Sequence, residues 1–590
     1  MDWKTTYHAP VRLVQVIVEP SAADSPVIRR GLRIFKDRMT RRCGAATTLR
    51  SAEFILTVGI DPTIGTDGFS IHGTKHGVKI MGSCPRAVVY GLGKYLHTSA
   101  YSADGFHPSR WQGTSNPTSQ FRGMQLDTHW CNFYHMAPAH ELAEYVEDII
   151  LWGVNYVEFV FPLIDLLGWD DPEVDKITGQ IKTIYDTAKA LGVKVGMEVV
   201  PNQDFVNQNM DICAQMSADR PGGKTGHNIC PNKPGAIEYI CNHTQGRTFE
   251  HLKAHGVVLD FVCFWPYDEG GCGCEACKPW GANGYLKASR AVADVVRTYL
   301  PEAEVILSTW MFDTYKEEKW SIRGQAEWEG LSRALAQDND WVNYILADAR
   351  EDFPAYPLKH GVPGNLPLLN YPEISMYKLK PWGGFGANPL PDHFEKLWQQ
   401  VKDVVQGGMA YSEGIFNDIN KALVSQFYWD KNTTAEQTLR EYMGYEFAPF
   451  VYDEVRQAMR LMEQNHEIAA SGPSGVVAVA GADPDKAHKV CRLLNAVDET
   501  LDARARKSWR WRLLIIRAEL DVLRYRCAEQ RKEELAENKL LCGEVLRGCD
   551  AAKPWLTELA QILHSNFDFN QETHPHYASV RPPLMEIENR

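Results

Sequence analysis

The sequence predicts an α/β protein in which a (β/α)8 barrel follows a small α+β domain and precedes an α-helical bundle. Between Phe121 and about Asn432, short apolar runs that suit buried parallel strands alternate with amphipathic stretches of helical length. Gly, Ser, Pro and Thr are concentrated from Ser99 to Gln120, and strand patterns stop after Asn432. We therefore expect three parts, at residues 1–115, 120–432 and 433–590.

The first part is expected to be a small α+β sandwich. Short β-patterned runs alternate here with stretches of helical periodicity. The expected strands are VRLVQVIVE from Val11, EFILTVGI from Glu53, FSIHG from Phe69 and GVKIMG from Gly77, and the expected helices run from Pro26 to Arg42 and from Pro85 to about His97.

The barrel is expected because eight strand candidates occur in succession, with helical segments between most of them. They are RGMQLD from Arg122, NYVEFVF from Asn155, VKVGMEVV from Val193, VVLDFVCF from Val257, EVILSTW from Glu304, VNYILAD from Val342, LPLLN from Leu366 and GMAYSEG from Gly408. No Gly-rich phosphate-binding pattern follows the first of these strands, which argues against a dinucleotide fold.

The last part is expected to be helical. Long amphipathic stretches rich in Arg, Glu and Leu cover Thr434 to Asn465, Asp483 to Arg504 and Ser508 to Gly548. Their charged runs are interpreted as solvated helix faces. The amphipathic tail is also a candidate homodimer face.

Composition excludes several classes of protein. With 44% hydrophobic and 23% charged residues, the chain is neither disordered nor collagenous nor a coiled coil. The net charge is −13, and no long basic run is present, so nucleic acid is not an expected partner. The first residues lack a secretory pattern and no window offers about 18 consecutive apolar residues, so we predict a soluble, cytoplasmic protein without a membrane partner.

Polar and aromatic residues stand just past most of the predicted strands, where barrel enzymes place their chemistry. Carboxylates and amides bind sugar hydroxyls, and aromatic rings stack on the apolar face of a sugar, so this pattern predicts a carbohydrate site. The candidates are Asp127, His129 and Trp130 after the first strand, Glu198 and Asn202 after the third, Trp265 and Tyr267 after the fourth, Trp310, Asp313 and Tyr315 after the fifth, Asp348 after the sixth, Asn370, Tyr371 and Glu373 after the seventh, and Tyr411, Glu413 and Asn417 after the eighth.

The adjacent carboxylates Asp268 and Glu269 at the end of the fourth strand are the predicted catalytic pair. Two like charges beside the apolar ring of Trp265 would raise one pKa, which suits a general acid for glycoside hydrolysis. If the substrate is a 2-acetamido sugar, its own amide oxygen can assist the reaction. Asp268 would then orient the acetamido group, and Glu269 would act first as acid and then as base.

A cysteine-rich run, CGCEAC, follows this pair. The C-x-C-x2-C spacing of Cys272, Cys274 and Cys277 suits tetrahedral thiolate ligation in an intracellular protein, so a structural zinc ion is expected. A closed site needs a fourth ligand. Cys230 in NICPNKP is our choice, with Cys263 or a nearby His as alternatives. Such an ion would brace the loop without an open position for catalysis.

The segment FRGMQLDTHW resembles the opening of the barrel in glycoside hydrolase family 20, the β-N-acetylhexosaminidases. That family also has a small α+β domain before its barrel and an Asp-Glu pair after the fourth strand. The resemblance implies that Arg122 binds hydroxyls of the non-reducing sugar and that Asp268 and Glu269 are catalytic. The helical tail and the cysteine run resemble the related barrels around family 163, in which an upstream Cys-Pro segment supports the choice of Cys230.

The expected activity is exo-acting, retaining hydrolysis of β-linked N-acetylhexosaminides of GlcNAc or GalNAc. Glu198 is interpreted as a hydroxyl acceptor or as a carboxylate that holds Arg122, and Trp310 with Tyr315 as a pocket wall. A second enzymatic hypothesis is a β-galactosidase-like or β-glucuronidase-like enzyme with Glu269 as acid/base and Glu373 as nucleophile. A third is a sugar-binding barrel without catalysis.

Overall fold

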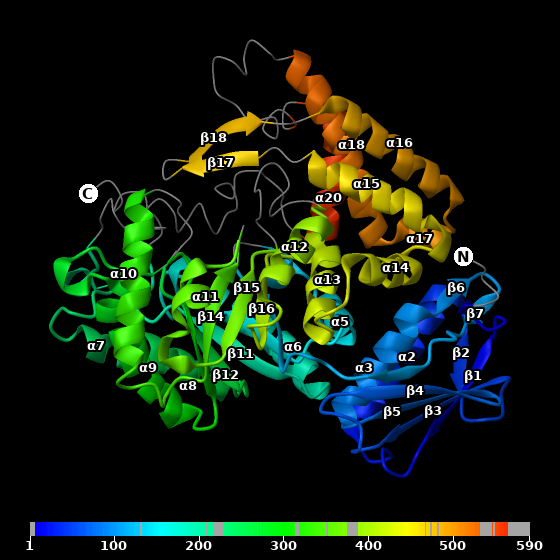
Figure 1. The fold of residues 1–590 in the computed structure, drawn as a ribbon, viewed down its shortest axis with the longest axis horizontal. Coiled ribbons are helices and arrows are strands. Elements are labelled where there is room, and N and C mark those ends of the chain that lie inside the picture. The colour runs from blue at the N-terminus through cyan, green and yellow to red at the C-terminus, as the bar shows by residue number, and fades with distance from the viewer. Residues whose placement is uncertain are drawn as a thin grey trace.

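The structure is a computed structural model, and it describes residues 6–129, 132–207, 209–215, 228–267, 270–312, 318–349, 352–374, 387–465, 468–472, 475–480, 483–530, 546 and 549–564. Figure 1 shows an N-terminal sheet domain in blue, a barrel in cyan to yellow-green, and a group of helices in yellow to red. The predicted fold class is confirmed. The domain boundaries given above stay predictions.

A six-stranded sheet in the order β2-β1-β3-β5-β4-β8 forms the N-terminal part. Helix α3 packs on β3, β4 and β5, and α2 packs on α3. Helix α2 begins after Ser25 because the Ser25 side chain accepts a hydrogen bond from the Ile28 amide and Pro26 suits the first helical turn. The elements are β1 (Leu13–Val18), α2 (Pro26–Cys43), β2 (Ala46–Thr48), β3 (Phe54–Ile60), β4 (Phe69–Thr74), β5 (Gly77–Gly82), α3 (Pro85–Thr98), β8 (Gly113–Ser115) and a hairpin of β6 (Ala100–Ser102) and β7 (Gly105–His107).

Eight parallel strands close the barrel, and β16 pairs with β9 to complete it. They are β9 (Phe121–Leu126), β10 (Tyr156–Val160), β11 (Lys194–Val199), β12 (Phe261–Phe264), β13 (Glu304–Ser308), β14 (Tyr344–Ala349), β15 (Leu368–Pro372) and β16 (Gly407–Ser412). Every residue of β9, β10, β12 and β15 is buried, as strands covered on both faces require. All eight strands are those predicted.

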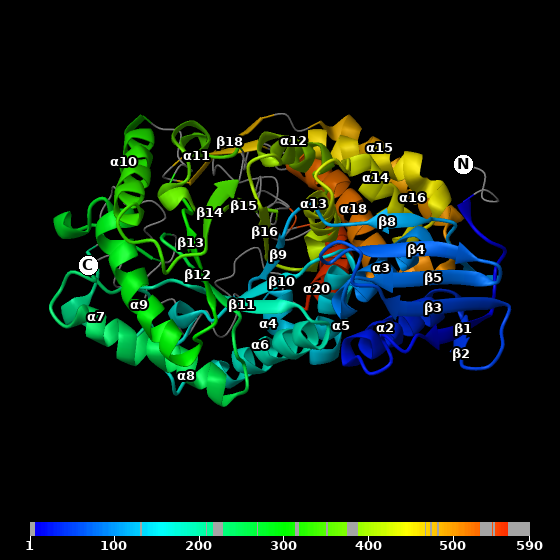
Figure 2. The same ribbon diagram turned by 60° about the horizontal axis from the view of Figure 1, so that its bottom comes forward.

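Helices follow the strands and lie on the outside of the barrel (Figure 2). They are α4 (Phe133–Met136), α5 (Ala139–Leu151), α6 (Glu173–Ala190), α7 (Ala236–Tyr239), α8 (Gln245–Ala254), α9 (Leu286–Tyr299), α10 (Glu318–Leu335), α11 (Ala355–His360), α12 (Pro391–Val401) and α13 (Asp418–Trp429). In the described part of the chain, no helix combines the length and the apolar character needed to cross a membrane.

The C-terminal part is mostly helical, with two differences from the prediction. The stretch expected as one helix up to Asn465 is two, because the chain turns at Phe447–Pro449. The expectation that no strand follows Asn432 is wrong, since β17 (Ile468–Gly472) and β18 (Gly475–Ala480) form an antiparallel hairpin. The helices are α14 (Ala435–Glu446), α15 (Tyr452–Gln464), α16 (Pro484–Thr500), α17 (Ala503–Lys507), α18 (Trp509–Gln530) and α20 (Lys553–Leu563).

Buried or half-buried guanidinium groups join the three parts at a surface that we call the junction. Arg38 of α2 donates to Asp148 of α5 at 2.8 Å. Arg510 of α18 donates to the other Asp148 oxygen at 3.0 Å and to Asp418 of α13 at 2.6 Å. Arg42 of α2 donates to Glu446 of α14 at 2.8 Å. Each contact ties a carboxylate of one part to a cation of another.

Candidate functional site

The carboxyl ends of the barrel strands, which we call the mouth, hold predicted site residues from several strands. Asp127 directly follows β9, Glu373 follows β15 and Glu413 follows β16, and all three side chains are buried. Glu198 lies near the end of β11 and is half-buried. The burial of several carboxyl groups at one end of a barrel is costly unless they are hydrogen-bonded, and such groups concentrate at functional sites.

Asp127, His129 and Glu413 form a group that we call the acidic cluster. The His129 Nε2 atom lies 2.5 Å from an Asp127 oxygen and 3.5 Å from a Glu413 oxygen. The Tyr411 hydroxyl lies within hydrogen-bond distance of an Asp127 oxygen, at 3.0 Å, and of a Glu413 oxygen, so it can donate its one proton to either. Burial opposes a charged imidazole, but the charges of Asp127 and Glu413 outweigh it and raise the pKa of His129 well above its usual value. At neutral pH the cluster therefore holds an imidazolium between two carboxyl groups.

An aromatic wall of Trp265, Trp310 and Tyr371 extends from β12 to β15. The rings of Trp265 and Trp310 are stacked, with centroids 5.4 Å apart. Tyr371 meets Trp265 edge-on at 4.9 Å and Trp310 edge-on at 5.5 Å. The ring centroids of Tyr371 and Tyr411 lie 5.9 Å apart, and the Tyr411 hydroxyl contacts the acidic cluster, so the wall extends to that cluster. An aromatic surface beside hydrogen-bonding carboxylates is the arrangement that binds a sugar ring.

Two further residues at the mouth were not singled out from the sequence. Gln125 of β9 accepts from the Tyr371 hydroxyl at 2.8 Å and donates to Glu198 at 2.6 Å, so it fixes Glu198 relative to the wall. Glu158 lies fully buried inside β10, where burial, followed by the charge of Asp127, raises its pKa well above the usual value. The sequence could have identified Glu158, because it places a carboxyl group inside the otherwise apolar run YVEFV.

The structure corrects the expectation for Arg122, which lies at the amino-terminal end of β9, away from the mouth. Its guanidinium donates to the carbonyls of Gly153 at 2.7 Å and Ser119 at 2.9 Å, and to Asp67 of the N-terminal part at 2.9 Å. The side chain is 1% exposed. Arg122 therefore joins two parts of the protein and does not hold a sugar or Glu198.

The side chains of Asn202 and Tyr267 also form hydrogen bonds within the protein. The Asn202 amide donates to the carbonyls of Ile229 at 2.9 Å and Gly271 at 3.1 Å, and its oxygen accepts from the Gly271 amide. The Tyr267 hydroxyl donates to Glu327 of α10 at 2.6 Å. These contacts hold the loops after β11 and β12, and the substrate-binding role expected for both side chains stays a prediction.

Some predicted residues lie outside the described part of the chain: the pair Asp268 and Glu269, the aromatic Trp130, and Asp313 and Tyr315. The pair is flanked by described residues on both sides. Trp265 at the end of β12 donates its amide to the Val199 carbonyl at 2.9 Å, and Gly271 is held by Asn202. The roles of the five residues stay predictions.

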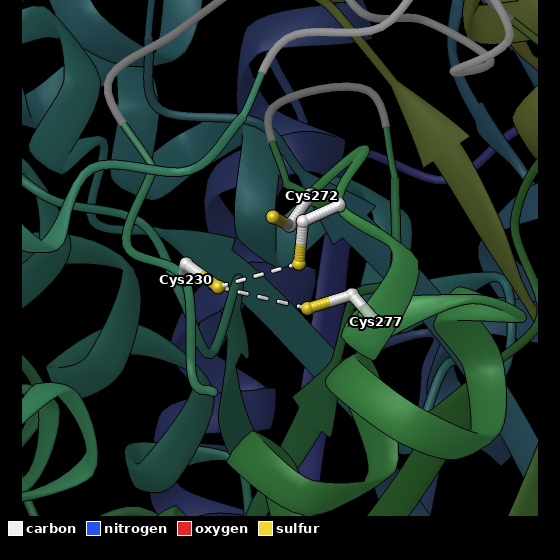
Figure 3. A group of neighbouring side chains, drawn as sticks. Cys230, Cys272 and Cys277 are labelled. Atoms are coloured by element: carbon white, nitrogen blue, oxygen red, sulfur yellow. Dashed lines mark hydrogen bonds between the residues drawn. The ribbon is translucent and has the colours of Figure 1, made fainter. Parts of the chain in front are cut away.

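The four predicted cysteines converge beside the mouth. Cys230 comes from the loop after β11, and Cys272, Cys274 and Cys277 come from the loop after β12. All four Sγ atoms lie within 4.8 Å of one another. Figure 3 shows Cys230 facing Cys272 and Cys277 across the gap between the two segments. Hydrogen bonds from the Cys272 and Cys277 thiols lower the pKa of Cys230.

Neither a protein-family model nor a curated protein sequence matches the chain. Among solved structures, a family 115 4-O-methyl-α-glucuronidase with specificity for decorated arabinogalactans is similar, with 10% identity and a TM-score of 0.60, over 98% of this chain and 78% of that one. A family 89 glycoside hydrolase from Clostridium perfringens, in complex with its substrate GlcNAc-α-1,4-galactose, is similar with 14% identity and a TM-score of 0.59. The match covers 92% of this chain and 65% of that enzyme. A family 20 exo-β-N-acetylglucosaminidase from Vibrio harveyi has 12% identity and a TM-score of 0.47, over 74% of this chain and 73% of that one. At these identities the first two likenesses show the fold.

Proposed function

We propose that this protein is a glycoside hydrolase that acts at the mouth of its barrel. The observation that carries the proposal is the acidic cluster beside the aromatic wall, with buried Glu373 at the end of the neighbouring strand. Sugar hydroxyls would bind the carboxylates, and the ring would stack on an indole. The fold likeness to hydrolases of families 115 and 89 supports the same class of reaction.

The finer proposal is exo-acting hydrolysis of a β-linked N-acetylhexosaminide. The Glu269 carboxyl group would give its proton to the glycosidic oxygen while the substrate's amide oxygen attacks C1 and the C1–O bond breaks. Asp268 would hold the amide in place and stabilise the charge that develops on it. The Glu269 carboxylate would then take a proton from the water that attacks C1, and the bond from C1 to the amide oxygen would break and regenerate the acetamido group. Two successive displacements at C1 give retention of configuration.

A second mechanism is favoured by the position of Glu373. This side chain is 1% exposed, directly follows β15, and its backbone pairs with Tyr411 beside the acidic cluster. A carboxylate in this place suits a nucleophile that forms a covalent glycosyl-enzyme, with Glu269 as acid/base. This alternative needs no acetamido group on the substrate.

The test is hydrolysis of aryl glycosides of GlcNAc, GalNAc, Glc, Gal and GlcA, in both anomers, by the wild type and by Glu269→Gln and Glu373→Gln. The matched control is Glu329→Gln on the exposed side of α10. Substrate assistance predicts activity that requires the acetamido group and falls about 10²–10⁴-fold in Glu269→Gln.

Activity on sugars without that group, abolished in Glu373→Gln, would replace substrate assistance by the covalent mechanism. Wild-type protein that binds sugars but hydrolyses none of these substrates would contradict both mechanisms and support a sugar-binding barrel.

A further inference from the structure

The cysteine cluster has the dimensions of a tetrahedral metal site. Four sulfur ligands at a Zn–S distance of about 2.3 Å lie about 3.8 Å from one another. In the structure, the Cys230 Sγ atom lies 3.8 Å from that of Cys274 and 3.8 Å from that of Cys277. These separations are far longer than a disulfide bond, which is about 2.05 Å.

Nitrogen donors point at the sulfurs, as thiolate ligands require. The Gln215 backbone amide donates to the Cys272 Sγ atom at 3.4 Å. The Asn232 side-chain amide donates to the Cys277 Sγ atom at 3.2 Å. Such N–H groups stabilise negative charge on sulfur in a buried place.

We infer that Cys230, Cys272, Cys274 and Cys277 bind one zinc ion and that this ion fixes the loop after β12 against the loop after β11. Each thiol loses its proton on binding, so that four thiols and Zn²⁺ give four protons and a dianionic zinc tetrathiolate. Four protein sulfurs leave no open position on the ion, so its role is structural.

Hydrogen bonds around the cluster show which segments the ion would join. Asn202 bonds to Ile229 and Gly271, the residues directly before Cys230 and Cys272. A third segment threads between them, because the Cys230 amide donates to Ile212 at 2.8 Å and the Gly273 amide donates to Gln215 at 2.6 Å. The ion would therefore hold three pieces of chain together at one point.

The loop after β12 is held at its other end by Glu327 of α10. This buried carboxylate accepts from the Tyr267 hydroxyl at 2.6 Å and from the Trp280 amide at 3.1 Å. The Trp280 indole in turn donates to the Pro266 carbonyl at 2.6 Å. Residues 268–269 thus fall between Tyr267, held by Glu327, and Gly271, held by Asn202. A role of this ion in catalysis through the predicted pair Asp268 and Glu269 rests on the proposed function, whereas metal binding stands without it.

The experiment is metal analysis of the full chain, purified under reducing conditions without chelator and supplied with zinc chloride. The variants are Cys274→Ser and Cys277→Ser, and the matched control is Cys241→Ser, a half-buried cysteine outside the cluster. We expect about one zinc per chain in the wild type and in the control, and at least a tenfold loss of bound zinc in both cluster variants. Cobalt(II) in place of zinc is expected to show the visible spectrum of a tetrahedral tetrathiolate only where all four cysteines remain.

Folding is followed by circular dichroism, and the half-buried Cys274 offers a mild substitution if Cys277→Ser fails to fold. Wild-type protein without zinc, a preference for iron over added zinc, or full zinc content in the folded Cys274→Ser variant would overturn the inference. Glu269→Gln is expected to keep its zinc. If this variant keeps both zinc and full hydrolytic activity, the role proposed for Glu269 fails while the metal site stands.

Discussion

Buried carboxyl groups have different partners at the junction and at the mouth. At the junction, to which we add the contact of Arg122 with Asp67 between the barrel and the N-terminal part, guanidinium groups neutralise the carboxylates. Asp148 accepts from both Arg38 and Arg510, and Asp67 accepts from Arg122. Although burial opposes it, the two arginines lower the pKa of Asp148 to about 2. At the mouth, carboxyl groups are held by a tyrosine hydroxyl, an amide and an imidazole, and burial raises the pKa of Asp127 and of Glu158.

This difference separates residues that hold the protein together from residues that are available for chemistry. A carboxylate paired with guanidinium groups has a lowered pKa and keeps its charge as the pH falls, and its oxygens are already engaged by the protein. A carboxyl group with a raised pKa takes up a proton more readily and can pass it on, as an acid or base must. The junction should therefore control stability and the mouth should control activity.

The largest effect on stability is expected for Arg122→Met. It leaves Asp67 buried with Arg86 as its remaining guanidinium partner, and the cost should be about 3 kcal/mol. Urea unfolding measures this cost, with the exposed Arg333 of α10, as Arg333→Met, for the control. Unchanged stability together with a raised KM would mean that Arg122 binds sugar after all and that the comparison is wrong.

A smaller, pH-dependent effect is expected for His129→Gln. In the wild type the raised pKa of His129 keeps it charged in the folded state, so its stabilising contribution is complete below the unfolded pKa of about 6.5. Without the imidazolium, Asp127 and Glu413 must share a proton that the unfolded chain does not bind. As the pH rises from 4.5 to 6.5, the free energy of unfolding of the variant should fall relative to that of the wild type, by up to about 1.4 kcal/mol per pH unit.

Thermal and urea unfolding at both pH values test this, and exposed His72→Gln is the control. A destabilisation that is the same at pH 4.5 and pH 6.5 would show that His129 does not balance the two carboxyl groups.

The smallest effect is expected for Tyr371→Phe. The variant keeps the aromatic wall but removes the hydroxyl that donates to Gln125, so Glu198 loses part of its support. One lost hydrogen bond is worth about 1 kcal/mol, which is about a fivefold fall in kcat/KM. Steady-state kinetics measure this fall in kcat/KM, with Tyr185→Phe on α6 as the control. A fall that also appears in the control would argue against a link from Tyr371 to Glu198.

The barrel strands were predictable because parallel strands covered on both faces are continuous apolar runs, and the end of each run locates the mouth. The cysteine cluster was equally predictable, because three of its cysteines lie within six residues of the sequence. The partner of Arg122 was not, since Asp67 is 55 residues away and belongs to another part of the protein. The sequence did offer one argument against a place for Arg122 at the mouth. Arg122 precedes Asp127 by five strand positions, about 16 Å along β9, so the two residues lie at opposite ends of the strand. The contacts of Asn202 depend on two distant loops, which no local pattern reveals.

The most direct test of the account compares Glu373→Gln with Arg122→Met in one experiment, in which hydrolysis at 25 °C and the midpoint of thermal unfolding are measured on the same samples. The account predicts that Glu373→Gln changes the rate or the choice of sugar while its midpoint stays near that of the wild type. Arg122→Met should lower the midpoint and keep the kcat of the molecules that remain folded. Loss of hydrolysis in Arg122→Met without loss of stability, with Glu373→Gln unaffected, would contradict the division between mouth and junction.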